Sequence, residues 1–260
     1  WMTNEKGEWL RLDEDGFYRI TEALTAEQIE VKRMASPKHA AQAAYPLNIA
    51  PRGLVILVNF KDLAFETSHA ELDSMLTGNN YTRDYSYTYR GKTYNITSEG
   101  SARQYFQDAS YGQYNPQFDV IGPVTISNNM SYYGKNDSYG DDMYPDKMVS
   151  EACKLADTEY DVDFTQYDND NDGYVDFVFV IYAGYGEADG GAATTIWPHS
   201  WNLLAAGTRC QVDGKTVDLY ACGNELDYYS KMHTGIGTFC HEFSHVLGLP
   251  DLYVTNTASH

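Results

Sequence analysis

Continuous apolar runs alternate with amphipathic stretches along the chain from about residue 53 onward. A continuous apolar run between turn residues predicts a strand buried on both faces, and a strict apolar-polar alternation predicts a strand with one exposed face. The expected strands are 53–60, the hairpin 81–96 turning at Arg90-Gly91, 118–127 with Pro123 at an edge or bulge, and 174–184.

Between these strands, apolar positions repeat every three to four residues, which predicts amphipathic helices. The expected helices are 68–76, 101–110, 145–160 and one beginning at about Gly235. Ser68 with Glu71 fits an N-terminal capping box, and Pro145 fits the first turn of a helix. Together the elements predict an α+β fold, in which helices pack on a mixed sheet.

Residues 1–50 differ in composition from the rest and predict a small N-terminal appendage to a main domain at 51–260. The segment 8–20 is expected to be a hairpin with Asp15-Gly16 at its turn, and 25–35 a short helix. An Ala- and Pro-rich linker follows. Two interpretations stay open: the remnant of an inhibitory pro-segment, with Asp13, Asp15 and His39 available to a metal, or a permanently packed structural appendage.

Charge narrows the classes of partner. The 260 residues include 37 acidic and 18 basic side chains, for a net charge of −19. Such a surface repels phosphate backbones and anionic lipid, so nucleic acid and membrane-surface partners are not expected. The sequence contains no run of 18 apolar residues, so no membrane span is expected either. The chain begins at Trp1 without a basic and apolar leader, as a processed product would.

Four cysteines allow three pairings. Cys210 and Cys222 flank a segment with Asp213-Gly214 at a hairpin turn, so a disulfide across this hairpin is one expectation and two reduced thiols the other. Cys153 and Cys240 are expected to pack as small hydrophobic side chains.

The segment HEFSH, residues 241–245, has the spacing of a metal site on a helix. His241 and His245 are four residues apart, so both imidazoles share one helix face and can bind one ion. Glu242 stands beside the pair, where a carboxylate can take a proton from water at the metal without being a ligand.

The residues that follow predict a third ligand. Gly248 can adopt the left-handed conformation that ends a helix, and the reversed chain then brings Asp251 back toward the metal. Three protein ligands leave one position open for water, as a catalytic zinc site requires. The alternative is a core helix with accidental spacing. A chance match to all of these positions is expected in roughly one chain in ten thousand of this composition, so a metal site is preferred.

A second candidate metal site is the segment DNDNDGYVD, residues 168–176. Gly173 stands at the sharp turn of a calcium-binding loop, but the bidentate glutamate of an EF-hand is missing. A shorter calcium loop leading into a strand is therefore expected, with an Asx-rich turn without an ion as the alternative. Its expected ligands are the carboxylates of Asp168, Asp170, Asp172 and Asp176 and the carbonyl oxygen of Tyr174.

The stretch HEFSHVLGLPDLY resembles the immune-inhibitor-A family of secreted bacterial zinc metallopeptidases, which is close to the metzincins. The resemblance extends through LVILVNFKD, SARQYFQDASYGQYNPQFDVIGPV, QYDNDNDGYVD and IWPHSW, and covers residues 52–256. It implies a zincin-like fold with His241, His245 and Asp251 as zinc ligands and Glu242 as general base. Metzincins carry a methionine turn after the third ligand, but here only nine residues follow Asp251, so the expectation is that the chain is a fragment or that the C-terminal subdomain is absent.

The sequence thus predicts a secreted or cell-surface bacterial zinc endopeptidase, a monomer acting on protein or peptide substrates, with catalytic zinc and structural calcium. His199, in IWPHSW, is a further candidate for substrate binding, although a histidine between two tryptophans is more often packed. Two other functions stay open: a catalytically silent adhesion module on the same fold, and a zinc hydrolase that acts on bonds other than peptides.

Overall fold

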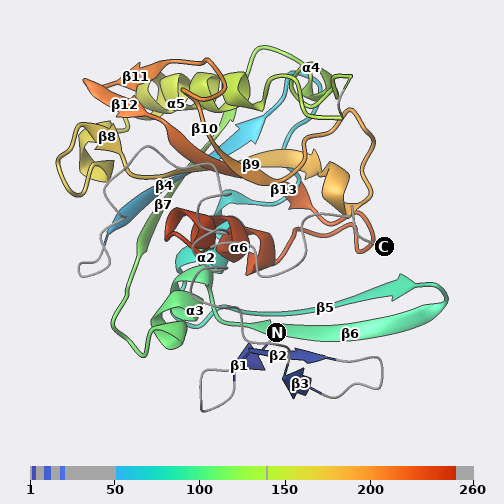
Figure 1. Ribbon diagram of the computed structural model, residues 1–260. Helices are drawn as coiled ribbons and strands as arrows, with labels where there is room; N and C mark the ends of the chain where they lie inside the picture. The colour runs from blue at the N-terminus through green and yellow to red at the C-terminus, as the bar shows by residue number, and fades with distance from the viewer. Residues whose placement is uncertain (1, 4–8, 13–17, 21–50, 139, 250–260) are drawn as a thin grey trace. The chain divides into compact units, whose positions relative to one another are not determined.

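A computed structural model of the chain describes residues 2–3, 9–12, 18–20, 51–138 and 140–249 (Figure 1). The chain divides into two compact units, one of Trp1–Gln42 with Gly248–His260 and one of Ala43–Leu247. In the first unit, β1 (Met2–Thr3), β2 (Trp9–Leu12) and β3 (Tyr18–Ile20) form an antiparallel sheet. The pairing of Leu12 with Tyr18 confirms the expected hairpin strands. The expected helix at 25–35 and the linker lie outside the described residues.

The second unit is built on a five-stranded sheet in the order β10-β13-β9-β4-β7. Four neighbouring strands are parallel, and only the edge strand β10 runs antiparallel to its neighbour. This mixed sheet with packed helices confirms the expected α+β class. The strands are β4 (Arg52–Asn59), β7 (Gln117–Thr125), β9 (Val178–Tyr185), β10 (His199–Asn202) and β13 (Leu219–Leu226).

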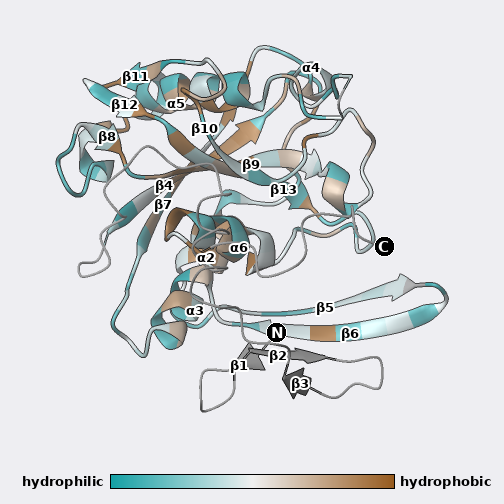
Figure 2. Cartoon of the chain, in the orientation of Figure 1, coloured by the Kyte–Doolittle hydropathy of each residue, from teal (hydrophilic) through white to brown (hydrophobic). Residues whose placement is uncertain are grey.

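Helices cover both faces of this sheet, which is why most residues of its central strands are apolar (Figure 2). Strand β4 sends Ile56 and Val58 into one core and Val55 and Leu57 into the other. The first core is closed by α4 (Met130–Tyr133) and α5 (Pro145–Tyr160). The second is closed by α2 (His69–Thr77), α3 (Ala102–Ala109) and α6 (Ile236–Val246).

The ends of the helices follow the sequence signals. The Ser68 hydroxyl accepts a hydrogen bond from the Glu71 amide at 3.2 Å, and Ser101 with Gln104 forms a complete capping box. These contacts satisfy amide groups that have no partner within the helix. Pro145 lies in the first turn of α5, and Gly235 is the N-cap of α6, as expected.

Two hairpins also form where the turn residues predict them. Strands β5 (Thr82–Tyr89) and β6 (Lys92–Glu99) pair around Arg90-Gly91, whose φ angles are 49° and 73°. Strands β11 (Cys210–Val212) and β12 (Lys215–Val217) pair around Asp213-Gly214, with φ angles of 51° and 74°. Positive φ at both central residues matches the right-handed twist of the flanking strands. The edge position of β7 likewise fits its Pro123.

One expectation is wrong. The run 174–184 forms two strands, because β8 (Tyr174–Val175) pairs with β12 in a small separate sheet, whereas β9 enters the large sheet. Of the two alternatives for Cys210 and Cys222, the structure has reduced thiols, and all four cysteines are free and buried. Cys222 lies on β13 in the large sheet, whereas the Cys210 thiol donates to the carbonyl oxygen of Ser150 on α5 at 3.9 Å. The hairpin is therefore shorter than the two cysteine positions suggest.

Candidate metal centre

Aromatic packing holds α6 against the sheet. The ring of Phe243 lies 5.1 Å from that of Phe106, 5.2 Å from that of Phe118 and 4.9 Å from that of Phe177, measured between centroids. These edge-on contacts join α3, β7 and the residue that precedes β9 to the helix, and Phe243 is fully buried. The orientation of the helix, and so of its polar side, is fixed by this core.

On the other side of α6, His241, Glu242 and His245 come together. Their potential ligand atoms all lie within 4.8 Å of one another, and the two imidazole centroids are 4.8 Å apart. The His241 side chain is 43% exposed, whereas that of Glu242 is 9% exposed, with 3.9 Å between His241 Nε2 and Glu242 Oε1. The i, i+4 spacing thus produces the expected imidazole pair, with an accessible side and a sheltered carboxylate.

The helix ends where the sequence predicts. Its last residue is Val246. Gly248 has φ +85°, a backbone conformation that residues other than glycine rarely adopt. Asp251 lies outside the described residues, so its role as third ligand stays a prediction.

The edge strand β10 contacts the same helix. His199 stands opposite Cys222 on β13, and both of its ring nitrogens are engaged. Nδ1 lies 2.7 Å from the Trp197 carbonyl oxygen, to which it donates, and Nε2 accepts from the Tyr220 hydroxyl at 2.9 Å. Burial lowers the pKa of His199, which favours this neutral form. The arrangement favours a positioning role within the strand, and substrate binding by His199 stays a prediction.

Cys222 connects this edge to the helix. Burial raises the pKa of the Cys222 thiol, and the carboxylate of Glu242 adds to the effect. Helix α6, which carries Glu242, contacts both β13 and β10. Sequence patterns gave no indication of Cys222 or of Tyr220 as neighbours of His199.

The acidic loop comes together in part. One carboxylate oxygen each from Asp168, Asp170 and Asp172 lies within 4.8 Å of the others. The Asp176 carboxylate instead accepts hydrogen bonds from the backbone amide and the side-chain amide of Asn169, both at 2.7 Å. Three of the expected calcium ligands are thus grouped, and Asp176 turns to a different partner.

A lysine that the sequence did not suggest lies against this loop. Lys215 Nζ is 2.6 Å from Asp168 Oδ2, across 47 residues. The pairing of β12 with β8 brings the two residues together, with Thr216 opposite Tyr174. Lys215 offsets part of the negative charge of the loop.

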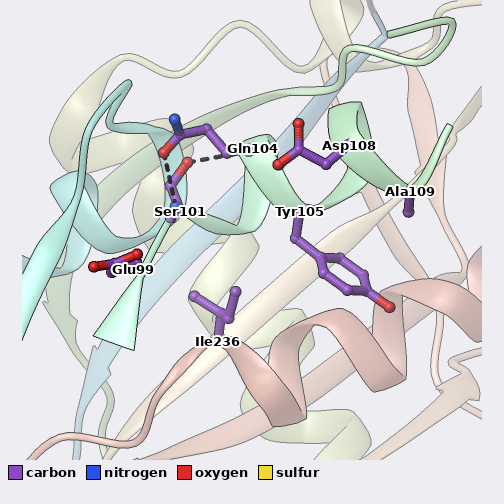
Figure 3. A pocket seen from close by; sticks show the side chains of 8 residues that line it. Glu99, Ser101, Gln104, Tyr105, Asp108, Ala109 and Ile236 are labelled. Carbon is purple, nitrogen blue, oxygen red and sulfur yellow. Dashed lines mark hydrogen bonds between the residues drawn. The ribbon is translucent and has the colours of Figure 1, made fainter. Parts of the chain in front are cut away.

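A hollow of about 330 Å³ lies between α3 and the start of α6 (Figure 3). Tyr105 and Ile236 project into it, and the Ser101–Gln104 cap forms part of its wall. Its ionisable lining groups other than Tyr105 are the carboxylates of Glu99 and Asp108, so it offers no metal site comparable to that of α6.

Among the described residues, no helix is long and apolar enough to cross a membrane. The site combines a helix that carries a His-Glu-x-x-His motif with the edge of a mixed sheet, an arrangement typical of metal-dependent hydrolases.

Comparison with known proteins identifies the family. Residues 50–260 match the family described as "Immune inhibitor A peptidase M6, catalytic domain", and the chain belongs to this family of metallopeptidases. It is 28% identical over 230 residues to the pre-pro-metalloprotease PrtV of Vibrio cholerae serotype O1, covering 78% of this chain and 25% of that protein. It is 27% identical over 249 residues to immune inhibitor A of Bacillus thuringiensis subsp. alesti, covering 85% and 36%. The chain thus spans between a quarter and about a third of the length of these relatives.

Proposed function

We propose that this chain is the catalytic domain of a secreted, zinc-dependent endopeptidase that uses Glu242 as general base. The proposal rests on the grouping of His241, Glu242 and His245 on α6, in a chain of the immune inhibitor A peptidase family. Both relatives bear the names of bacterial proteins, and one is named a pre-pro-metalloprotease. The sequence features of residues 1–50 favour a pro-segment remnant ahead of a catalytic domain at 51–260.

The residues present fit zinc. Two imidazole nitrogens with a carboxylate from Asp251 are a common donor set for this ion, and they leave a position open. The exposure of His241 gives a substrate access to that position. The antiparallel edge strand β10 beside the helix supports a zincin-like, metzincin-related fold.

Zinc bound at this site would supply a Lewis acid that polarises the scissile carbonyl and lowers the pKa of a water molecule. Glu242 takes the proton from the attacking water and gives it to the nitrogen of the leaving amine as the C–N bond breaks. The Glu242 side chain is 9% exposed, and its Oε1 lies 3.9 Å from His241 Nε2, so a sheltered carboxylate stands beside the imidazole pair.

Separate measurements of metal content and of cleavage test the proposal. Glu242→Gln is expected to keep about one zinc per chain and to lose peptide cleavage by at least about 100-fold, because only the base is removed. His245→Ala and Asp251→Ala are expected to lose the zinc as well. Glu159→Gln, an exposed carboxylate on α5, is the matched control and should leave both properties unchanged.

The same measurements distinguish the two alternatives. A silent adhesion module would bind zinc without cleaving a mixed peptide library, whereas a zinc hydrolase acting on other bonds would hydrolyse ester or amide reporters but no peptide. Cleavage of peptides by Glu242→Gln at the parental rate would contradict the assigned base.

We further propose that the 168–176 loop binds a structural calcium ion. The grouping of Asp168, Asp170 and Asp172 supports it, since carboxylate oxygens are preferred ligands of this ion. Asp176 and the Tyr174 carbonyl oxygen are the further proposed ligands. Lys215 opposes binding through its contact with Asp168.

A further inference from the structure

Two loops outside both candidate metal sites pack closely on each other. One is 134–142, which precedes α5, and the other is 187–197, which precedes β10. Gly134 lies so close to the second loop that an added Cβ would stand 2.5 Å from the Thr195 carbonyl carbon. The loops are also joined by a 2.8 Å hydrogen bond from the Trp197 amide to Asp142 Oδ2.

Side-chain oxygens gather between these loops. Asn136 and Asp142 are directly opposite each other in an antiparallel bridge, so their side chains leave the ribbon on the same side. The Asn136 amide nitrogen lies 3.2 and 3.3 Å from the two carboxylate oxygens of Glu187. One amide and two carboxylates from the two loops are thereby brought together.

Two of these oxygens are buried and accept no hydrogen bond from any residue that the structure describes. They are Asn136 Oδ1 and Asp142 Oδ1. The Asn136 amide cannot simply be reversed, because its carbonyl oxygen would then face the Glu187 carboxylate. Buried acceptors without a donor cost free energy, and they occur where a ligand, an ion or a water molecule is bound.

No basic side chain among the described residues balances the negative charge of the Asp142 and Glu187 carboxylates. Burial raises the pKa of Asp142 to about 6, and the carboxylates of Glu187 and Asp141 act in the same direction. No salt bridge to either Asp142 or Glu187 is found among the described residues. A cation at the two free oxygens would satisfy them and offset the repulsion between the carboxylates.

We propose that Asn136, Asp142 and Glu187 form a second calcium site, separate from the 168–176 loop. An amide oxygen with two carboxylates is the all-oxygen donor set of a hard cation, and calcium accepts such an irregular arrangement completed by water. The ion braces the segment that leads into β10, because the Trp197 amide is bound to Asp142 and His199 follows two residues later.

Counting bound ions tests the site. The zinc-saturated full chain is dialysed against about 1 mM calcium, and the bound calcium per chain is measured. Asp142→Asn is expected to lose one calcium relative to the parent, because a neutral amide replaces a ligand of similar shape. Asp141→Asn removes the same charge from the adjacent exposed residue and should keep the full number.

A second measurement separates loss of the ion from loss of the fold. Terbium replaces calcium, and its emission is excited through Trp197, whose backbone lies at the site. Glu187→Gln and Asp142→Asn should weaken this signal at least about tenfold in terbium affinity, with unchanged circular dichroism. Asp170→Asn serves as a control for the acidic loop and should leave the signal in place.

Equal calcium content and equal terbium affinity in the parent and Asp142→Asn would overturn the proposal, and water would then be the occupant of the two oxygens. Failure of the 168–176 site would give a different result. In that case Asp170→Asn would bind as much calcium as the parent, whereas Asp142→Asn would still lose one ion.

Discussion

The ring of Phe177 lies 4.9 Å from the ring of Phe243, at an interplanar angle of 61°. Phe177 directly follows Asp176 of the acidic loop, and Phe243 directly follows Glu242 of the metal motif. The two candidate metal sites are therefore joined through one aromatic contact in the second core. Changes in this core act on the position of the helix that carries the imidazoles.

Phe243→Ala tests this connection. We expect a loss of about 3–5 kcal/mol in the free energy of unfolding, because a fully buried ring that packs against four others is removed. Weaker zinc binding should accompany it, since the packing that orients His241 and His245 is lost. Denaturant unfolding and zinc titration measure the two effects. Tyr111→Ala, at a ring 92% exposed, is the matched control and should change neither.

Lys215→Met is expected to strengthen calcium binding at the acidic loop. The ammonium group contacts Asp168 at 2.6 Å and competes with an ion for the same carboxylate. Calcium titrations followed by the melting temperature should show a larger rise at a given concentration. Lys154→Met, an exposed lysine on α5, provides the control. A rise in melting temperature equal to that of the parent would show that Lys215 does not compete.

The stability of the domain should fall as pH decreases below about 6.5, in part because of His199. Its pKa is lowered by burial in the folded state, so the unfolded chain binds the additional proton first. Stability is thus greatest above the unfolded pKa and is lost as pH falls through it. His199→Gln should flatten this part of the profile of melting temperature against pH. A profile as steep as that of the parent would contradict the assignment.

Glu225→Gln should destabilise the domain by about 1–3 kcal/mol. The fully buried Glu225 carboxylate accepts hydrogen bonds from three backbone amides, those of Glu66, Thr67 and Gly184. An amide would turn a donor toward at least one of them. Glu99→Gln, at an exposed position, is the control, and equal unfolding free energies for both variants would refute the role.

The four thiols should not react with an aromatic disulfide reagent in the native protein, and all four should react in denaturant. Each is buried and unpaired, so access depends on unfolding. Fewer than four reactive thiols in denaturant would reveal a disulfide, and rapid reaction in the native state would contradict the burial.

The local elements of this protein could be read from its sequence. Buried strands, capped helices and hairpin turns appear where the pattern predicts them, because each depends on residues only a few positions apart. The imidazole pair belongs to this class, since a helix brings His241 and His245 together whatever surrounds it. The family resemblance is confirmed as well.

Only the tertiary structure decided which segments meet. Lys215 reaches Asp168 because β12 pairs with β8, and Cys210 reaches the Ser150 carbonyl oxygen because β11 packs against α5. Asn136 and Glu187, 51 residues apart, lie in contact because two loops close on each other. These contacts follow from how sheets and loops pack around two cores. No short-range pattern encodes such packing, whereas backbone propensity and side-chain spacing encode the elements themselves.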